Sequence, residues 1–192
     1  MSVSLEKRQT VSLAKQGSSL TSVKIGLGWD PVKKKGLFGM FGGSDSIDLD
    51  ASCVLLDASG SVVDTVWFRN LKSNCGSVQH SGDNLTGEGD GDDEVITVDL
   101  TRLPAKVEYL AVTVNSFRGQ TFDEVDNAFC RIVDQSNKEL AIYKLNEKGS
   151  HTGVLISSLK RNGGAWDFTA RGLACRGRMV NDMLPQITAE IL

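Results

Sequence analysis

The chain has 192 residues, of which 40% are hydrophobic and 23% are charged, and its formal net charge is −3. These values are ordinary for a globular protein of one domain, and the negative charge argues against a nucleic-acid partner. Four cysteines without Cys-x-x-Cys spacing and only two histidines argue against a zinc site. No apolar run approaches the ~18 residues of a membrane span and no signal-peptide core is present, so we expect a cytoplasmic location.

Short runs of β-type residues recur along the chain between turn signals. The sequence predicts strands at 23–29, 51–56, 62–68, 95–100, 109–114, 128–133, 140–145, 154–159 and 166–171. The expected fold class is therefore all-β, a β-sandwich of about nine or ten short strands. Gly60 and Asn137 occupy turn positions between these strands that need a positive φ.

Residues 179–192 are the best helix candidate, because Met179, Met183, Ile187 and Ile191 recur at helical spacing. Pro185 is expected to kink this short C-terminal helix or to begin a second one.

The segment 50–60 resembles the segment 127–137 without a gap. We interpret the chain as one domain over 1–192 that contains two similar halves, 22–100 and 108–172. The alternative is that any two β-hairpins share this degree of similarity.

The most informative segment is 82–94, where acidic residues alternate with glycines, and no Lys or Arg occurs from 73 to 101. Two like charges ~4 Å apart repel by about 4 kcal/mol at an effective dielectric of about 20, so a folded loop of this kind needs a cation. Carboxylates and carbonyls without His or Cys favour calcium, with magnesium second. The alternative is a solvated loop, since Gly and Asp are ordinary turn residues.

A second acidic segment, Asp48-Leu49-Asp50, directly precedes a predicted core strand. In an extended chain Asp48 and Asp50 point to the same face, at the entrance of the strand. An EF-hand is excluded, because Leu85 and Gly87 replace oxygen-bearing side chains and Glu88 stands where that loop requires glycine.

Three motifs together resemble the TerD family over residues 11–172. They are Gly26-Leu27-Gly28-Trp29-Asp30, Asp48-Leu49-Asp50-Ala51-Ser52 and the long acidic block 81–94. The Lys- and Gly-rich insertion after Asp30 and the segment 114–120 are most similar to the TerZ-like branch of that family. The resemblance implies a calcium-binding β-sandwich encoded in bacterial tellurite-resistance and stress-response operons.

The resemblance also implies a ligand set, matched position by position. The side-chain ligands would be Asp48, Asp50, Asp83, Asn84, Asp90, Asp92, Asp93 and Glu94. Leu85, Gly87 and Gly89 would supply carbonyls, and Asp30 is a further candidate. With added carbonyls and water, these groups suffice for two Ca²⁺ ions at about seven oxygens each.

Residues 33–43, from Lys33 to Gly43, alternate basic, bulky apolar and glycine residues. This composition predicts a contact loop for other tellurite-resistance proteins or for the inner face of the membrane. The alternative is that the loop folds back onto the protein's own surface.

We therefore expect a calcium-dependent interaction module without enzymatic activity. One alternative is a magnesium-dependent phosphohydrolase, although neither His80 nor His151 lies in a recognisable catalytic motif. Another is thiol chemistry on tellurite by Cys75, which lies in a predicted loop and is the best candidate for a reactive thiol.

Overall fold

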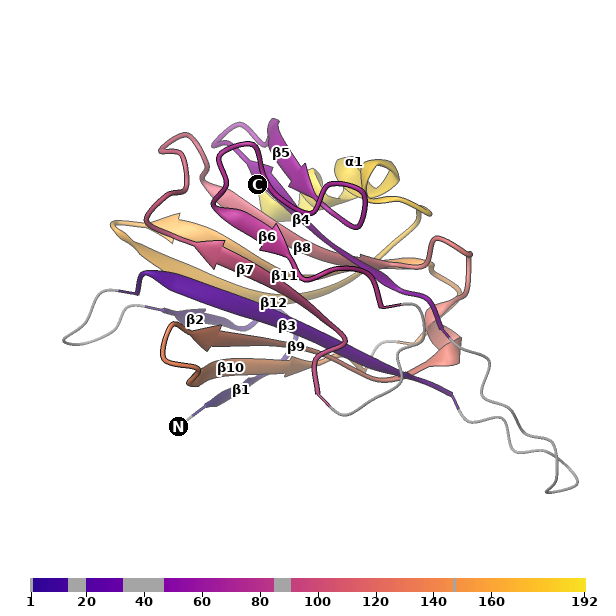
Figure 1. The fold of residues 1–192 in the computed structure, drawn as a ribbon. Helices are drawn as coiled ribbons and strands as arrows, with labels where there is room; N and C mark the ends of the chain where they lie inside the picture. The colour runs from indigo at the N-terminus through magenta and orange to yellow at the C-terminus, as the bar shows by residue number, and fades with distance from the viewer. Residues whose placement is uncertain (1, 14–19, 33–46, 85–90, 147) are drawn as a thin grey trace, which may run out of the picture.

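The computed structural model describes residues 2–13, 20–32, 47–84, 91–146 and 148–192. Within these ranges, twelve strands form two six-stranded sheets that pack face to face, with a single α-helix at the C-terminus (Figure 1). The predicted contact loop 33–43 lies outside the described residues, as do Leu85, Gly87, Gly89 and Asp90.

Sheet A has the strand order β1-β10-β9-β3-β7-β6. The strands are β1 (Val3–Leu5), β10 (Glu139–Lys144), β9 (Val125–Asp134), β3 (Ser22–Pro31), β7 (Glu94–Asp99) and β6 (Val78–His80). Neighbouring strands are antiparallel, except that the edge strand β1 runs parallel to β10.

Sheet B has the strand order β2-β12-β11-β8-β4-β5, and all its neighbours are antiparallel. The strands are β2 (Thr10–Ser12), β12 (Ala165–Cys175), β11 (Gly153–Asn162), β8 (Tyr109–Asn115), β4 (Asp50–Leu56) and β5 (Val62–Val66).

The prediction of an all-β sandwich with a C-terminal helix is confirmed. All nine predicted strands are present, and β1, β2 and β6 are additional. Each of the additional strands has three residues, too few to show an alternating pattern.

The main core lies between the sheets, because alternate residues of each strand point into the sandwich. In β3 the inward residues are Val23, Ile25, Leu27 and Trp29, all buried. β4 is buried on both faces: Cys53 and Leu55 face the sandwich, whereas Val54 and Leu56 belong to a second cluster under the helix.

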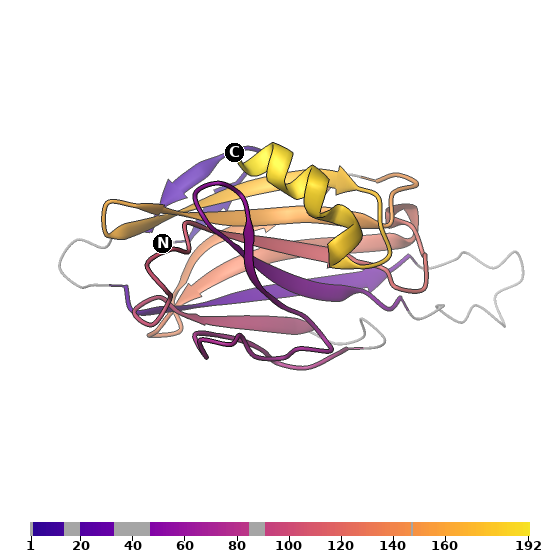
Figure 2. The same cartoon turned by 90° about the horizontal axis from the view of Figure 1, so that it is seen from above.

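The helix α1 (Val180–Ile191) lies on the outer face of sheet B (Figure 2). Val180, Met183, Ile187 and Ile191 are its buried residues, in keeping with the predicted helical spacing. Of the two alternatives for Pro185, a kink or a second short helix, the second helix does not form: α1 continues through Pro185 as one element.

Each sheet combines strands from both predicted halves. The hairpin β4–β5 pairs with β8, and the hairpin β9–β10 pairs with β3. The turns after β4 and β9 are built alike: Asp57 Oδ1 accepts the N–H groups of Ser59 and Ser61, as Asp134 Oδ1 accepts those of Ser136 and Lys138. Gly60 and Asn137 in these turns have φ values of 80° and 61°, as expected. The duplication itself stays a prediction.

The register brings the acidic segments to one end of the sandwich. Asp50, the first residue of β4, pairs with Asn115 at the end of β8. In the other sheet, Glu94 begins β7 and pairs with Leu27 near the end of β3. Strand ends from both sheets therefore meet beside Asp48 and Asp50.

Candidate metal centre

Three carboxylates form a compact group that we call the acidic cluster: Asp48, Asp50 and Asp83. Each offers one carboxylate oxygen, and these oxygens all lie within 4.8 Å of one another. Asp48 and Asp50 are only 7% and 4% exposed, whereas Asp83 is exposed. Asp48 Oδ1 and Asp50 Oδ2 are buried without a hydrogen-bond partner in the structure. Unpaired buried carboxylate oxygens are costly, so this group calls for a cation.

The environment of the cluster opposes ionisation. Burial, followed by the charges of Asp48, Glu94 and Asp83, raises the pKa of Asp50 from 3.8 to about 7, against a hydrogen bond from the Phe117 backbone. Burial also raises the pKa of Asp48, although the Arg118 guanidinium opposes the rise. A bound divalent cation would relieve both the mutual repulsion and the loss of hydration.

The donor set fits a hard divalent cation. All three side chains present carboxylate oxygens, and hard oxygen donors are what calcium and magnesium take. Two unpartnered oxygens within one small group are the observation that carries this fit. Among the described residues, this is the one group of three such side chains that could hold a metal ion.

The side chains of the cluster are positioned by neighbours from both sheets. Trp29 Nε1, at the end of β3, donates to the Ile47 carbonyl at 3.2 Å and so places the residue before Asp48. The Asp48 backbone N–H donates to Gln120 Oε1, also at 3.2 Å. Arg118 Nε lies 2.8 Å from Asp48 Oδ2. Sequence reasoning missed Gln120 and Arg118, whose proximity depends on the pairing of β4 with β8.

Glu94 is fully buried, and both of its carboxylate oxygens accept hydrogen bonds from the backbone. Its Oε2 accepts from the Ala51 backbone N–H at 2.7 Å, and its Oε1 accepts from the Asn84 N–H at 3.0 Å. His80 Nε2 lies 3.2 Å from the same Oε2. His80 Nδ1 accepts from the Gly82 N–H, so Nε2 carries the ring proton that faces Glu94. Glu94 and His80 thus hold the backbone on either side of the cluster, at Ala51, Gly82 and Asn84.

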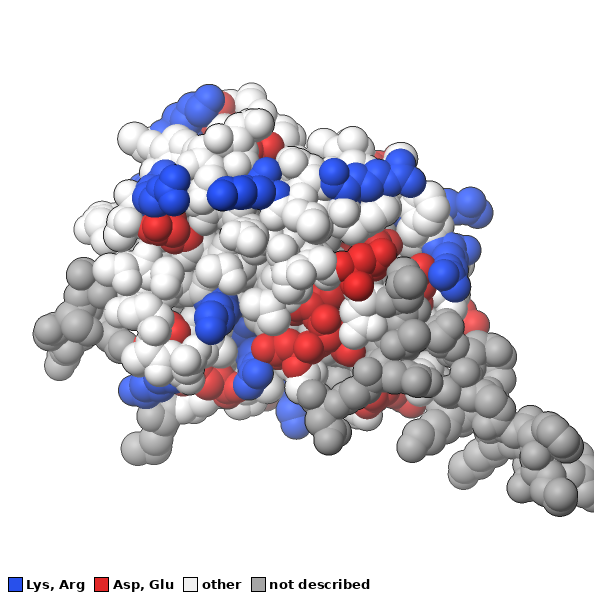
Figure 3. Space-filling view, in the orientation of Figure 1, with Lys and Arg blue, Asp and Glu red and all other residues white. Residues whose placement is uncertain are grey.

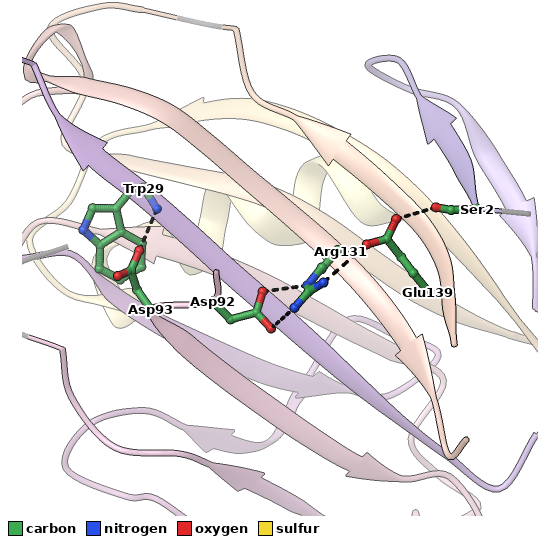
Figure 4. A network of polar contacts seen from close by, with 6 residues as sticks. All are labelled: Ser2, Trp29, Asp92, Asp93, Arg131 and Glu139. Carbon is green, nitrogen blue, oxygen red and sulfur yellow. Dashed lines mark hydrogen bonds and ion pairs between the residues drawn. The ribbon is translucent and has the colours of Figure 1, made fainter. Parts of the chain in front are cut away.

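Asp92, a predicted ligand, is not part of the acidic cluster, and its carboxylate points toward Arg131 (Figure 4). Arg131 binds it with Nε at 2.7 Å and Nη2 at 2.9 Å. Arg131 also reaches Glu139, which accepts a hydrogen bond from Ser2. This network lies across the outer face of β3, where Gly26 has no side chain and leaves room for the Asp92 carboxylate.

Asp93 and Asp30 line a separate cleft of about 580 Å³, together with Trp29, Asp126 and Lys148. Asp93 Oδ2 accepts from the Trp29 N–H and Oδ1 from Asn84 Nδ2, whereas Asp30 accepts from Asn127. Burial raises the pKa of Asp93, with a further contribution from Asp30. These two predicted ligands are near each other, but their carboxylates already have protein partners.

Figure 3 shows acidic side chains gathered near the middle of one face, with basic side chains above them and to their lower left. Cys75 is partly exposed, unlike the buried Cys53 and Cys130, whose pKa values burial raises to about 12. Burial opposes ionisation of Cys75 as well, but hydrogen bonds from Ser73 and Ser77 outweigh it and lower the pKa of the thiol.

Within the described ranges, no helix has the length and apolar character that a membrane span requires.

Comparison with known proteins identifies relatives along nearly the whole chain. It is 68% identical over 191 residues to tellurium resistance protein TerZ of Serratia marcescens, covering 99% of each chain. It is 40% identical over 196 residues to stress response protein SCP2 of Bacillus subtilis (strain 168), covering 96% of this chain and 98% of that one.

A solved structure supports the fold. It is a homologue of telluride resistance protein (TerD) from Streptomyces coelicolor A3(2), with a TM-score of 0.66 and 24% identity. The match covers 83% of this chain and 92% of that chain. The TerD domain itself matches residues 1–184. The chain therefore belongs to the TerD domain family, as a member similar to TerZ.

Proposed function

We propose that this protein is a calcium-binding protein of a bacterial tellurium-resistance and stress-response system, acting in the cytoplasm as a calcium-dependent interaction module. The system is suggested by the names of its relatives, which include tellurium resistance and stress response proteins. The polar side chains around the acidic cluster are hydrogen-bonded to one another and to the backbone. This arrangement agrees with a site that binds an ion and controls a contact, without an enzymatic reaction.

The observation that carries the proposal is the pair of buried, unpartnered oxygens on Asp48 and Asp50, with Asp83 beside them. The Arg118 guanidinium meets Asp48 Oδ2 but leaves Oδ1 without a partner. A cation with several oxygen ligands would satisfy both orphaned oxygens together. The second predicted ion would draw on ligands outside the described residues, so the stoichiometry is part of the test.

Calorimetric titration of the metal-free protein tests the proposal. Calcium should bind below millimolar concentration, and magnesium should bind more weakly because it loses its water reluctantly. At a hundredfold excess over Kd, calcium should stabilise the fold by about 2.7 kcal/mol, which a thermal melt would detect. Absence of heat and of any melting shift with calcium would refute the proposal.

Thiol chemistry on tellurite is the second candidate, favoured by the partly exposed Cys75 and its lowered pKa. Replacement of Cys75 by Ser distinguishes the two. Calcium binding and the stress phenotype should both survive if the interaction role is right. Loss of tellurite resistance with intact calcium binding would instead support the thiol. Magnesium-dependent hydrolysis receives no such support, because His80 is engaged with Glu94 and Gly82.

A further inference from the structure

Two tight turns close to the acidic cluster carry the same pair of side chains at their central positions. In the first, Trp67 and Asn70 exchange backbone hydrogen bonds of 3.1 and 2.8 Å around Phe68-Arg69. In the second, the Gly119 N–H donates to the Ser116 carbonyl at 3.2 Å around Phe117-Arg118. Each turn therefore presents a phenylalanine next to an arginine at its tip.

The two turns touch through their aromatic rings. The rings of Phe68 and Phe117 meet edge to face, with centroids 6.1 Å apart. The Arg69 guanidinium lies 5.2 Å from the Phe68 ring centroid and 5.7 Å from that of Phe117, with Trp67 at 5.8 Å. These rings orient the guanidinium without neutralising it, and Arg69 has no ion-pair partner within the described part of the chain.

This surface combines apolar exposure with positive charge. Phe117 is 42% exposed and Leu71, just beyond the first turn, is 43% exposed. The side chain of Arg118 is 55% exposed. We call the group of Trp67, Phe68, Arg69, Leu71, Phe117 and Arg118 the Phe-Arg surface. The Arg69 guanidinium, which has no ion-pair partner among the described residues, suits phosphate or carboxylate oxygens.

The second turn is joined directly to the acidic cluster. The Phe117 backbone N–H is hydrogen-bonded to Asp50, and Arg118 Nε lies 2.8 Å from Asp48 Oδ2. Arg118 is thus a counter-ion supplied by the protein itself. Any cation held by Asp48 and Asp50 competes with it for the same carboxylate.

Building on the proposed function, we propose that the Phe-Arg surface docks on an anionic lipid membrane when a divalent cation occupies the acidic cluster. Turn tips with paired apolar and cationic side chains fit a flat boundary between hydrocarbon and phosphate. A peptide would need a groove, and the cleft beside Asp30 and Asp93 is lined by other residues.

The charges explain why docking depends on the ion. Without the ion, Arg118 is held on Asp48 and is therefore not available to anionic headgroups. Uptake of the ion neutralises the carboxylates and releases the guanidinium, which then faces the lipid beside Arg69. Each basic side chain near such a surface contributes about 1 kcal/mol, equivalent to about a fivefold change in affinity.

Sedimentation with vesicles tests the proposal. The full chain should sediment with vesicles of equal parts phosphatidylcholine and phosphatidylglycerol in calcium, and at least tenfold less in chelator. It should not sediment with pure phosphatidylcholine. Arg69→Gln should weaken the calcium-dependent binding about fivefold with unchanged calcium affinity by calorimetry, and Phe117→Ser should weaken vesicle binding further.

Matched controls come from the other end of the sandwich. Lys138→Gln removes one exposed positive charge in the turn after β9, and Val62→Ser removes an exposed apolar side chain at the start of β5. Both should sediment like the wild type. Equal losses in these variants would show that only net charge or general hydrophobicity matters, and would overturn the assignment to the Phe-Arg surface.

Asp48→Asn separates this inference from the proposed function. It frees Arg118 without any metal, so it should raise binding to anionic vesicles in chelator above that of the wild type.

If calcium binds the wild type but no vesicle binding appears, the membrane proposal fails and the calcium proposal stands. If calcium does not bind at all, the Asp48→Asn variant still tests the role of Arg118. Vesicle binding in chelator that is the same in this variant and in the wild type would refute that role. Saturable binding of an acidic peptide without vesicle binding would point to a protein partner and overturn the membrane assignment.

Discussion

Glu94 and Ala51 belong to different sheets, and the Glu94 Oε2 atom accepts a hydrogen bond of 2.7 Å from the Ala51 N–H. The same carboxylate accepts the Asn84 N–H and faces His80 Nε2. One fully buried side chain therefore joins β7, the start of β4 and the segment before the acidic block. It fixes the distance between the two sheets where Asp48 and Asp50 enter.

Glu94→Gln should destabilise the metal-free protein by about 2 kcal/mol. The amide oxygen can keep the Ala51 hydrogen bond, but the amide NH₂ then meets the Asn84 N–H, which is also a donor. Hydrogen bonds to a charged group contribute about 1.5–3 kcal/mol, and one is lost. Urea unfolding measures the change. The exposed Glu6→Gln serves as the control, and an equal effect in both variants would contradict the structural role of Glu94.

Gly26→Ala should disrupt the contact of Asp92 with Arg131. An added Cβ at position 26 would lie 2.3 Å from Asp92 Cγ and from both carboxylate oxygens, so the side chain must leave. We expect a loss of about 1–3 kcal/mol in unfolding free energy. A double-mutant cycle checks the cause: in an Asp92→Ala background the same substitution should cost much less. A cost that is unchanged in that background would place the strain elsewhere in the sheet.

Ile187→Ala should lower the stability by about 2–5 kcal/mol, because it leaves a cavity between α1 and sheet B. Asn181→Ala, at an exposed position of the same helix, should have little effect. Both variants should keep the calcium affinity of the wild type, since the helix does not contribute to the acidic cluster. A change in affinity for Ile187→Ala alone would reveal coupling between the helix and the site.

The strands were predictable because their period is visible in the sequence. Ile25, Leu27 and Trp29 alternate with Gly26 and Gly28, which is the pattern of a strand with one buried face. The sequence alone does not explain why positions 26 and 28 are glycine. The structure supplies the reason: the Asp92 carboxylate and the Phe129 ring occupy the space where their side chains would be.

The candidate site was predictable in part. The grouping of Asp48, Asp50 and Asp83 joins two segments that the sequence marked as acidic, and their separation in the chain did not hide the shared chemistry. The contacts of Asp92 with Arg131 and of Asp48 with Arg118 depend on strand pairing, which composition does not reveal. An acidic residue in a motif is therefore a candidate ligand until its cationic neighbours are known.

The stability of the metal-free protein should fall as the pH rises from about 4 to about 7. The native Asp50 keeps its proton up to a pKa of about 7, whereas the unfolded chain loses it near 3.8. The native state therefore binds more protons in this window, and deprotonation favours unfolding. Asp48 and Asp93, whose pKa values burial also raises, act in the same direction. Thermal melts in chelator across this range measure the slope.

The contribution of Asp50 to that slope can be isolated. Asp57 and Asp99, whose pKa values are lowered by hydrogen bonds from Ser59 and Thr101, act below this window, because both remain ionised within it. Asp50→Asn should flatten the fall in stability between about pH 4 and about pH 7. An unchanged slope in this variant would assign the pH dependence to other groups.

Asp50→Asn should have opposite effects on the two states of the protein at neutral pH. In chelator it should be more stable than the wild type, because an amide carries no charge to bury beside Asp48, Asp83 and Glu94. In calcium, the variant should bind the ion at least about tenfold more weakly, since a lost ionic ligand is worth about 1.4 kcal/mol or more.

Asp92→Asn should behave differently, with lower stability in chelator through the weakened Arg131 contact and a smaller loss of calcium affinity. Parallel melts and calorimetric titrations of the two variants measure both quantities. Equal losses of affinity in both would mean that Asp92 leaves Arg131 to join the ion, and that the ligand set is larger than the acidic cluster.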